Sequence, residues 1–266
     1  KVWQGKAPSY LMYDFIKIKG AGGKISSSTG KVITLQDCLK IYEPEIIRYL
    51  FAGTRPGTEF AISFDTDVIK VYEDYDKCER IAYGVQAANE REQKKQKIIY
   101  DFSQLNEDAQ TQPAKCPLQI GFRHISTIIQ IRNLNEEATY TYFADKVKTS
   151  FDEQKLKTRI SCVKNWLENY ADEQFRFVIK DEQDEAFIAQ LTKQQREALA
   201  KLKAAITAST DFASMEAAIY EVPKDTDMDM KEFFQLCYQA IIGKDKGPKL
   251  AVFIDEIGKE NVAKLL

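Results

Sequence analysis

Residues 14–65 read DFIKIKGAGGKISSSTGKVITLQDCLKIYEPEIIRYLFAGTRPGTEFAISFD, and this stretch decides the fold at the start of the chain. The aromatic, β-rich segment at 9–19 predicts one or two strands. A glycine-rich loop follows at 20–31. Thr34 then begins a helix, because Asp37 three residues later has the spacing of a capping box. This order predicts α/β structure in the first part of the chain.

The same stretch predicts a second helix and a short strand. Proline is well placed in the first turn of a helix, so Pro44 marks the start of this one. Gly53 suits its end. Apolar side chains at helical spacing give it a buried face, and they are Ile46, Ile47, Leu50 and Phe51. Residues 60–64 alternate as a short strand does.

Beyond residue 65 the pattern becomes predominantly helical. Residues 66–96 have apolar side chains at helical spacing, and 98–102 predicts one further strand. A polar stretch with prolines follows, and we interpret it as a linker that reaches about Pro117. Later helices are expected at 118–134, 136–147, 152–170, 192–208, 211–221, 229–242, 249–257 and 259–266. We therefore predict a mainly α protein whose later part is a helical bundle.

Composition excludes several classes of protein. The chain has 266 residues, of which 44% are hydrophobic and 29% charged, as in ordinary globular proteins. No apolar run approaches the roughly 20 residues of a membrane span, and no secretory leader opens the sequence. The first residue is Lys1 rather than Met. We expect an excised fragment of a cytoplasmic protein that does not bind membranes.

Cysteine and histidine usage predicts no metal centre. The cysteines are odd in number, widely spaced and without a CxxC pair, which argues against a disulfide framework and a zinc ribbon. They are Cys38, Cys78, Cys116, Cys162 and Cys237. The single histidine, His124, excludes a His-rich site within this chain, and we interpret it as a surface or capping residue.

Charge is distributed unevenly along the chain. Residues 1–55 have nine Lys or Arg against four Asp or Glu, a balance of +5, whereas the whole chain has a net charge of −2. Residues 56–266 therefore sum to −7. This pattern fits a protein that meets phosphate at chosen places rather than one that coats nucleic acid.

The glycine-rich loop has the equipment to hold a polyphosphate. Its sequence, GAGGKISSSTGK, presents Lys24, then the hydroxyls of Ser26, Ser27 and Ser28, then Lys31. Glycines allow backbone amides to approach an anion closely, lysines supply positive charge, and hydroxyls donate hydrogen bonds. The spacing is not that of a Walker A loop. A Gly/Ser linker is the alternative interpretation on composition alone.

The segment Lys24-Ile25-Ser26-Ser27-Ser28 resembles the KMSKS signature of class I aminoacyl-tRNA synthetases in its lysyl variant. The whole run 14–65 is similar to the class I lysyl family, and EPEIIRYLF within it is especially close. Residues 165–179 and 238–266 resemble the closing segments of the same family. The resemblance therefore covers essentially the whole chain.

The resemblance implies an ATP-dependent ligase that activates lysine and charges lysine tRNA. Lysine carboxylate would attack the α-phosphorus of ATP, with Mg²⁺ accompanying the nucleotide, and pyrophosphate would leave. Lys24 would stabilise the growing charge on pyrophosphate, while Ser26, Ser27 and Ser28 donate hydrogen bonds. Gly22, Gly23 and Lys31 would complete the nucleotide contacts, and Gly20 would act as a hinge with the other glycines.

Two departures from the family pattern qualify that expectation. Thr29 stands where the family often has lysine, so the second positive charge would come from Lys31 or elsewhere. The HIGH motif that completes the ATP site is not within this chain, and the lysine-recognising residues of such enzymes lie upstream. We therefore expect the chain to be inactive alone.

The implied domain order has three parts. Residues 1–33 would end a class I Rossmann-type α/β catalytic domain, 34–108 would form a small α/β stem-contact connector, and 109–266 would be an all-α anticodon-binding bundle. Anticodon bases are read by stacking on aromatics or arginine and by edge hydrogen bonds. We expect a monomer that binds lysine tRNA.

One feature supports an RNA-binding face independently of the resemblance. Residues 109–135 contain no acidic residue, in a half that is otherwise rich in acids. An amphipathic helix that lacks Asp and Glu by chance is an equal alternative. The candidate tRNA contacts are Lys115, Arg123, Arg132, Trp166, Arg176, Lys244, Lys246 and Lys249. Core packing is the favoured interpretation of Trp166.

Three alternatives stay open at this point. A glutamyl enzyme shares a class I catalytic domain and a helical anticodon cage. A non-catalytic RNA-binding module would use the loop only as a linker. A purely structural helical protein would leave the extended match unexplained.

Overall fold

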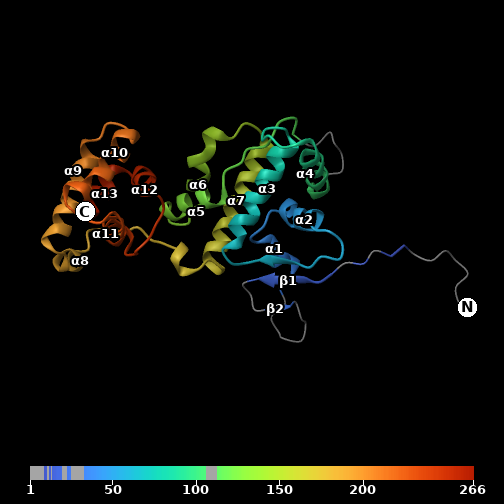
Figure 1. Cartoon of the computed structure of the whole chain (residues 1–266), viewed down its shortest axis with the longest axis horizontal. Coiled ribbons are helices and arrows are strands. Elements are labelled where there is room, and N and C mark those ends of the chain that lie inside the picture. Colours follow the sequence, from blue (N-terminus) through green and yellow to red (C-terminus); the bar gives the residue numbers. More distant parts are fainter. Residues whose placement is uncertain (1–8, 11, 13, 20–22, 25–32, 106–112) are drawn as a thin grey trace, which may run out of the picture. The chain divides into compact units, whose positions relative to one another are not determined.

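The computed structural model describes residues 9–10, 12, 14–19, 23–24, 33–105 and 113–266. The chain divides into two compact units (Figure 1). The first unit contains residues 1–125 and 140–171, and the second contains 126–139 and 172–266. The mainly α class predicted from the sequence is confirmed. The predicted domain boundaries at 33/34 and 108/109 stay predictions.

A small sheet lies at the start of the first unit. Its strands are β1 (Ile16–Lys19), β2 (Gly23–Lys24) and β3 (Phe60–Ser63), in the order β2-β1-β3. β1 pairs antiparallel with β2 and parallel with β3. The parallel pair is possible because the chain between β1 and β3 includes a crossover with two helices, α1 (Leu35–Leu39) and α2 (Pro44–Gly53). The strands expected within 9–19 and 60–64 are thus confirmed for the described residues.

The first two helices of the first unit begin where the sequence predicts. α1 (Leu35–Leu39) starts after Thr34, whose side chain and that of Asp37 form the expected capping box. α2 (Pro44–Gly53) has proline in its first turn. The other helices that lie wholly or partly in this unit are α3 (Asp67–Ala82), α4 (Glu90–Ser103), α5 (Phe122–Ile131), α6 (Glu136–Phe143), the 3-10 turn η3 (Ala144–Lys146) and α7 (Ser150–Asn169). The boundary between the units falls within α5 and α6.

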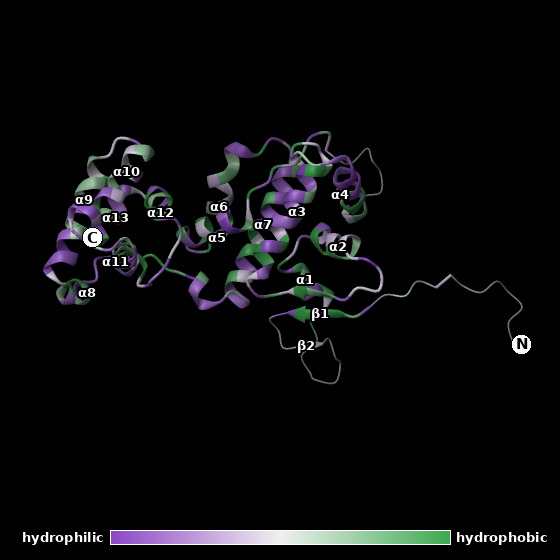
Figure 2. Cartoon of the chain, viewed as in Figure 1, coloured by the Kyte–Doolittle hydropathy of each residue, from purple (hydrophilic) through white to green (hydrophobic). Residues whose placement is uncertain are grey.

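Two predictions around α4 are wrong. The helix expected over 66–96 is interrupted at Gly84, whose φ of 70° suits glycine, and Asn89 then caps a new helix by accepting from the Glu92 N–H. The strand expected at 98–102 is the end of α4. Its β-rich composition is overridden by packing, because Ile99 and Tyr100 are buried against the neighbouring helices while the rest of α4 is largely hydrophilic (Figure 2).

The core of the first unit is rich in aromatic side chains. Tyr42 stacks on Tyr72 with ring centroids 5.9 Å apart, and Phe122 meets both Tyr72 and Trp166. Five β-branched apolar side chains of this core are fully buried, and they are Ile41, Ile46, Val68, Ile125 and Val163. These side chains come from α2, α3, α5, α7 and the turn before α2. The packing therefore joins sequence positions more than 100 residues apart.

The second unit is a helical bundle with its own core. Its remaining elements are η4 (Glu173–Phe175), α8 (Glu185–Gln190), α9 (Lys193–Ala208), α10 (Phe212–Asp225), α11 (Met230–Ile242), α12 (Leu250–Ile257) and α13 (Lys259–Leu265). The predicted helices from 192 onward are confirmed, and α8 was not predicted. Fully buried side chains at its centre include Leu202, Ile206, Met215, Ile219, Phe233, Phe253 and Val262.

Candidate functional site

The glycine-rich loop at 20–31 begins after β1, and two of its residues, Gly23 and Lys24, form β2. In the antiparallel pair, Lys17 lies opposite Lys24 and Ile18 lies opposite Gly23. Lys24 is therefore the last residue of β2, and in the sequence the serine run begins two residues later. The other predicted loop residues lie outside the described part of the chain, and they are Gly20, Gly22, Ser26, Ser27, Ser28 and Lys31.

β3 fixes the end of β1 from which the loop leaves. The parallel register places Lys17 opposite Ala61 and Lys19 opposite Ser63. One residue further, the Phe64 N–H donates to the carbonyl of Lys19 at 2.9 Å. The Lys19 ammonium contacts Asp67, and this hydrogen bond raises the pKa of Lys19. The backbone thus attaches the end of β1 to the residue that follows β3, and the Lys19 side chain attaches it to the start of α3.

Two buried side chains in turn hold the end of β3. The Tyr42 hydroxyl donates to the carbonyl of Ser63 at 2.7 Å, and Trp166 Nε1 donates to the carbonyl of Phe64 at 3.2 Å. Trp166 is 0% exposed, so its indole face is not available to an RNA base. The candidate tRNA contact at Trp166 is corrected accordingly, and the core packing favoured from the sequence is what the structure shows.

A buried arginine on α7 was missed in the sequence. Arg159 is 2% exposed, and its guanidinium donates to both carboxylate oxygens of Asp76 at 2.8 Å and to Glu43 Oε1 at 2.6 Å. It also donates to the carbonyl of Ile120 at 3.0 Å. A signal was present, because Arg159 lies between Leu156 and Val163 at helical spacing on an apolar face. An arginine in that position needs buried acidic partners.

A second buried ion pair lies beside the first. Lys155 Nζ is 2.5 Å from Glu79 Oε2, and the two side chains are 9% and 1% exposed. Gln119 donates to the same Glu79 oxygen at 2.6 Å. Both ion pairs connect α7 with α2 or α3. The first unit is therefore held together by charge pairing as well as by its aromatic core.

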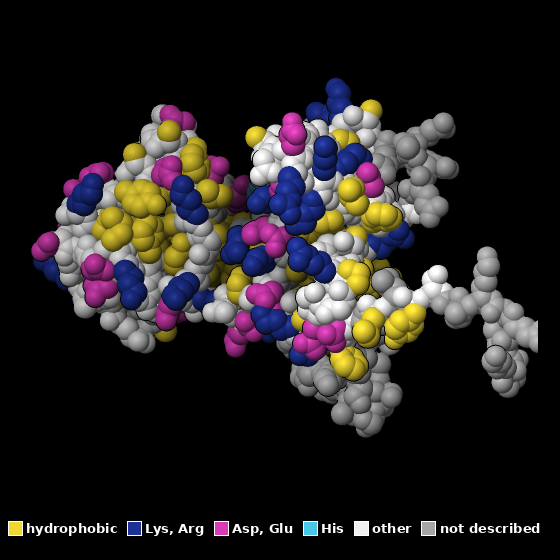
Figure 3. All heavy atoms as spheres, turned by 45° about the vertical axis from the view of Figure 1, so that its right-hand side comes forward, with side chains coloured by type: hydrophobic (Ala, Val, Ile, Leu, Met, Phe, Trp, Pro, Cys, Tyr) yellow, Lys and Arg dark blue, Asp and Glu magenta, His cyan; other side chains and the backbone are white. Residues whose placement is uncertain are grey.

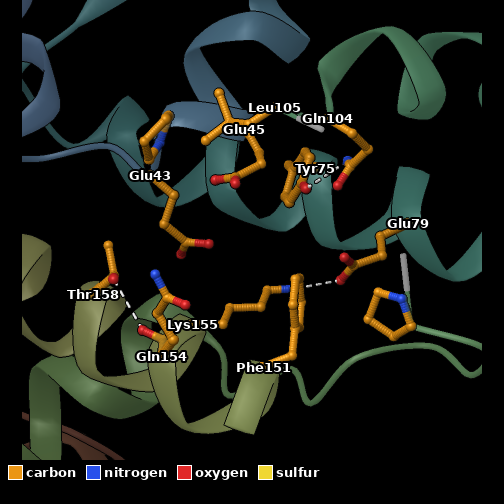
Figure 4. Close-up of a pocket in the computed structure, with 12 residues that line it drawn as sticks. Glu43, Glu45, Tyr75, Glu79, Gln104, Leu105, Phe151, Gln154, Lys155 and Thr158 are labelled. Carbon is orange, nitrogen blue, oxygen red and sulfur yellow. Dashed lines mark hydrogen bonds and ion pairs between the residues drawn. The ribbon is translucent and has the colours of Figure 1, made fainter. Parts of the chain in front are cut away.

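Three members of these ion pairs, Glu43, Glu79 and Lys155, line a pocket of about 420 Å³ in the first unit (Figure 4). The carboxylates of Glu43 and Glu45 and the Lys155–Glu79 pair lie around one open space. Burial raises the pKa of Glu45, and the nearby Glu43 raises it further. The residues that line the pocket are Glu43, Pro44, Glu45, Tyr75, Glu79, Gln104, Leu105, Pro113, Phe151, Gln154, Lys155 and Thr158. The pocket has mixed charge with an excess of carboxylates.

No thiol in the chain is set up as a nucleophile. Burial raises the pKa of Cys78 and Cys162 to about 12, and it raises the pKa of Cys38, Cys116 and Cys237. A raised pKa disfavours the thiolate, which is the reactive form. Within the described residues, no group of three or more His, Cys, Asp or Glu side chains could hold a metal ion.

The candidate tRNA contacts of the acid-free segment lie on the surface, as Lys and Arg do on the face drawn in Figure 3. Lys115 and Arg123 are exposed, and Arg132 is half-buried. Arg176 is exposed at the end of η4. His124 is exposed on α5, and its ring meets Phe143 edge-on at 5.2 Å.

The three lysines after α11 differ in their surroundings. Lys244 Nζ donates to the carbonyl of Glu173 at 2.7 Å. Lys249 Nζ is 2.5 Å from Glu216, and this contact raises the pKa of Lys249. Lys246 is exposed, and no described residue forms an ion pair with it. Of the three, Lys249 therefore has its charge partly neutralised by a carboxylate, and Lys246 is exposed without such a partner among the described residues.

Family models match both parts of the chain. Residues 1–106 match the model described as tRNA synthetases class I (K), and residues 134–265 match an anticodon binding domain. The second match includes α7, although α7 belongs to the first compact unit. Among the described residues, no helix is long and apolar enough to cross a membrane.

Curated relatives match along the whole chain. A lysine–tRNA ligase of Borrelia garinii subsp. bavariensis is 42% identical over 274 residues, which is 100% of this chain and 50% of the relative. Lysine–tRNA ligases of Treponema pallidum and Thermococcus kodakarensis are 38% and 32% identical, and the chain covers 49% and 51% of them. The chain thus spans about half the length of the curated relatives it matches.

Proposed function

The chain belongs to the class I lysine–tRNA ligases, and from that premise we propose that it supplies the ATP-pyrophosphate loop and the tRNA anticodon-binding part of such an enzyme. The matched family is the lysine type, so the glutamyl alternative is disfavoured. The single observation that supports the proposal most is the succession of a synthetase match and an anticodon-binding match in one chain. A purely structural protein does not account for it.

The proposed reaction has two steps, of which this chain serves the first through its loop. Lysine attacks the α-phosphorus of ATP to give lysyl-adenylate and pyrophosphate, and the lysyl group is then transferred to lysine tRNA with release of AMP. Lys24 stabilises negative charge on pyrophosphate as the bond breaks, and Ser26, Ser27 and Ser28 donate hydrogen bonds. The backbone pairing of Lys24 at the end of β2 supports this role, because strand pairing fixes the backbone position of the residue that carries the charge.

Gly22, Gly23 and Lys31 complete the proposed nucleotide contacts. We expect Mg²⁺ to accompany ATP and to be held chiefly by its phosphates. Magnesium commonly keeps several waters and binds through substrate phosphates, which agrees with such an arrangement. The chain itself would contribute positive charge to the leaving group, and we expect the enzyme to act as a monomer.

Binding of tRNA tests the second half of the proposal. The chain would be titrated into labelled lysine tRNA and into a copy with a substituted anticodon, each at two salt concentrations. We expect tighter binding to the native anticodon, and we expect this preference to survive the higher salt because base contacts depend on salt less than phosphate contacts do.

The opposite result would be informative. Equal binding to both tRNAs that weakens steeply with salt would show phosphate attraction alone, and the anticodon-binding role would have to be withdrawn for this chain. An unrelated tRNA of the same length is the control for shape recognition.

A further inference from the structure

The backbone of Phe64 joins α7 to the strand pair that positions Lys24. Its N–H donates to the carbonyl of Lys19 at 2.9 Å, and its carbonyl accepts from Trp166 Nε1 at 3.2 Å. Lys19 ends β1, and Lys17 on the same strand lies opposite Lys24 on β2. An unbroken path of hydrogen bonds and strand pairing thus runs from an indole on α7 to Lys24.

A second donor acts on the neighbouring peptide. The Tyr42 hydroxyl donates to the carbonyl of Ser63 at 2.7 Å, and Ser63 lies opposite Lys19 in the parallel register. Tyr42 and Trp166 are both fully buried. Two consecutive carbonyls at the end of β3 are therefore held by donors on two fully buried side chains.

The family match and the compact units assign α7 to different parts of the chain, and this makes the contact between Trp166 and Phe64 informative. By sequence it lies inside the match to the anticodon-binding domain at 134–265, whereas by structure it belongs to the compact unit that contains the sheet. Its buried polar side chains point into that unit, where Lys155 pairs with Glu79 and Arg159 with Asp76. The helix is thus fixed to α3 near the same sheet whose strand end Trp166 holds.

We propose that Trp166, assisted by Tyr42, is a positioning residue for Lys24 in adenylate formation. This inference rests on the proposed function of Lys24. Neither aromatic side chain contacts substrate in the proposal. Each fixes the direction of a β3 carbonyl, β3 fixes the end of β1, and β1 fixes the backbone of Lys24 through the Lys17–Lys24 pair. A small displacement of a charged group at a reacting centre is costly to rate, so the effect belongs in kcat.

The test uses the complete enzyme that contains this chain, and it measures lysine-dependent ATP–pyrophosphate exchange. Trp166→Phe keeps an aromatic ring and removes the N–H donor. We expect kcat to fall roughly three- to tenfold, the factor equivalent to one buried hydrogen bond, while KM for lysine stays unchanged. The dissociation constant for tRNA, measured separately, should also stay unchanged.

Phe122→Leu is the matched control. Phe122 packs edge-on against Trp166 with ring centroids 5.4 Å apart, so this change loosens the same core and leaves the Trp166–Phe64 bond in place. Its kcat should stay within about twofold of the wild type at a temperature where circular dichroism shows every variant folded. An equal loss of kcat in Phe122→Leu and Trp166→Phe would overturn the proposal, as would wild-type kcat in Trp166→Phe.

Tyr42→Phe keeps the inference falsifiable if Trp166→Phe does not fold. This change is nearly isosteric and removes only the hydroxyl that donates to Ser63. A lower kcat with unchanged KM for lysine is expected here too, and wild-type kcat would overturn the proposal. Failure of the underlying function looks different. If Lys24 does not stabilise pyrophosphate, Lys24→Ala keeps wild-type exchange, and if the enzyme does not activate lysine, the unaltered enzyme shows no lysine-dependent exchange at all.

Discussion

Arg159 on α7 donates two parallel hydrogen bonds, each 2.8 Å long, to the carboxylate of Asp76 on α3. The third guanidinium nitrogen reaches Glu43 just before α2. Two buried carboxylates and one buried guanidinium thus meet where three segments of the first unit join. A planar fork of donors suits this arrangement, whereas a lysine could not bond to both acids in this geometry.

Removing this arginine should destabilise the chain strongly. Arg159→Met keeps most of the side-chain volume but leaves Asp76 and Glu43 as uncompensated buried carboxylates. We expect a loss of about 3–5 kcal/mol in the free energy of unfolding, the cost typical of breaking a buried ion pair. Urea unfolding followed by circular dichroism measures it.

A surface lysine gives the comparison for that experiment. Lys97 pairs with Asp101 on α4, and both side chains are well exposed. Lys97→Ala should change the free energy of unfolding by less than about 1 kcal/mol, because water screens such pairs. If the two variants unfolded alike, the buried network would have no special role in stability.

Glu45 predicts a pH dependence of stability. Burial raises its pKa above the ordinary value of 4.5, with a further contribution from Glu43. The folded state therefore holds this proton more tightly than the unfolded state, so the ionised carboxylate costs stability as pH rises above about 4.5. Glu45→Gln removes that cost, and its stability relative to wild type should increase with pH.

Urea unfolding of both proteins from about pH 4 to about pH 8 checks this sign. The difference between variant and wild type should grow across the lower part of that range and then level off. The pH dependence is the decisive readout, because loss of a carboxylate in the first turn of α2 has its own pH-independent cost. A difference that does not change with pH would contradict the prediction.

The features that the sequence predicted correctly are local ones. Thr34 and Asp37 are three residues apart, and Pro44 acts within its own first turn, so their structural roles are visible in a short window. The segment 98–102 misleads for the same reason. Its composition is that of a strand, and only burial of Ile99 and Tyr100 against distant helices makes it helical.

The site features that the sequence did not predict depend on long-range pairing. Arg159 and Glu43 are 116 residues apart, and Trp166 and Phe64 are 102 apart. No short window contains both partners of either contact. The loop residues could be predicted because a family resemblance names them, whereas the roles of Arg159 and Trp166 need the packed structure.

The lysines after α11 should contribute unequally to tRNA binding. Lys246 is exposed without an ion pair among the described residues, whereas Lys249 is paired with Glu216. Lys246→Ala should lower affinity for lysine tRNA and reduce the slope of log K against log salt by about 0.9. Lys249→Ala should have a smaller effect, because its charge is already partly neutralised.

Affinities of both variants at several salt concentrations make the comparison. Glu216→Gln sharpens it, since freeing Lys249 from its partner should strengthen salt-dependent binding. Equal slopes for wild type and Lys246→Ala would place the tRNA away from this segment.

Lys24 can be tested against a neighbouring lysine on the same strand pair. Lys17 lies directly opposite Lys24, but its ammonium is paired with Glu59 at 2.6 Å. In the complete enzyme, Lys24→Ala should reduce kcat for ATP–pyrophosphate exchange by about 10²–10³, the usual cost of losing a group that stabilises transition-state charge. KM for lysine should change little, because the proposed contact forms only as pyrophosphate leaves.

Lys17→Ala should keep kcat within about twofold of the wild type, since it removes only an exposed ion pair. The two lysines are directly paired across the β1–β2 strand pair, so the two variants lose the same net charge from the same part of the sheet. If both variants lost the same factor, net positive charge near the sheet would explain the result and Lys24 would have no specific role. If neither lost activity, charge stabilisation of pyrophosphate would have to come from elsewhere, with Lys31 the next residue to substitute.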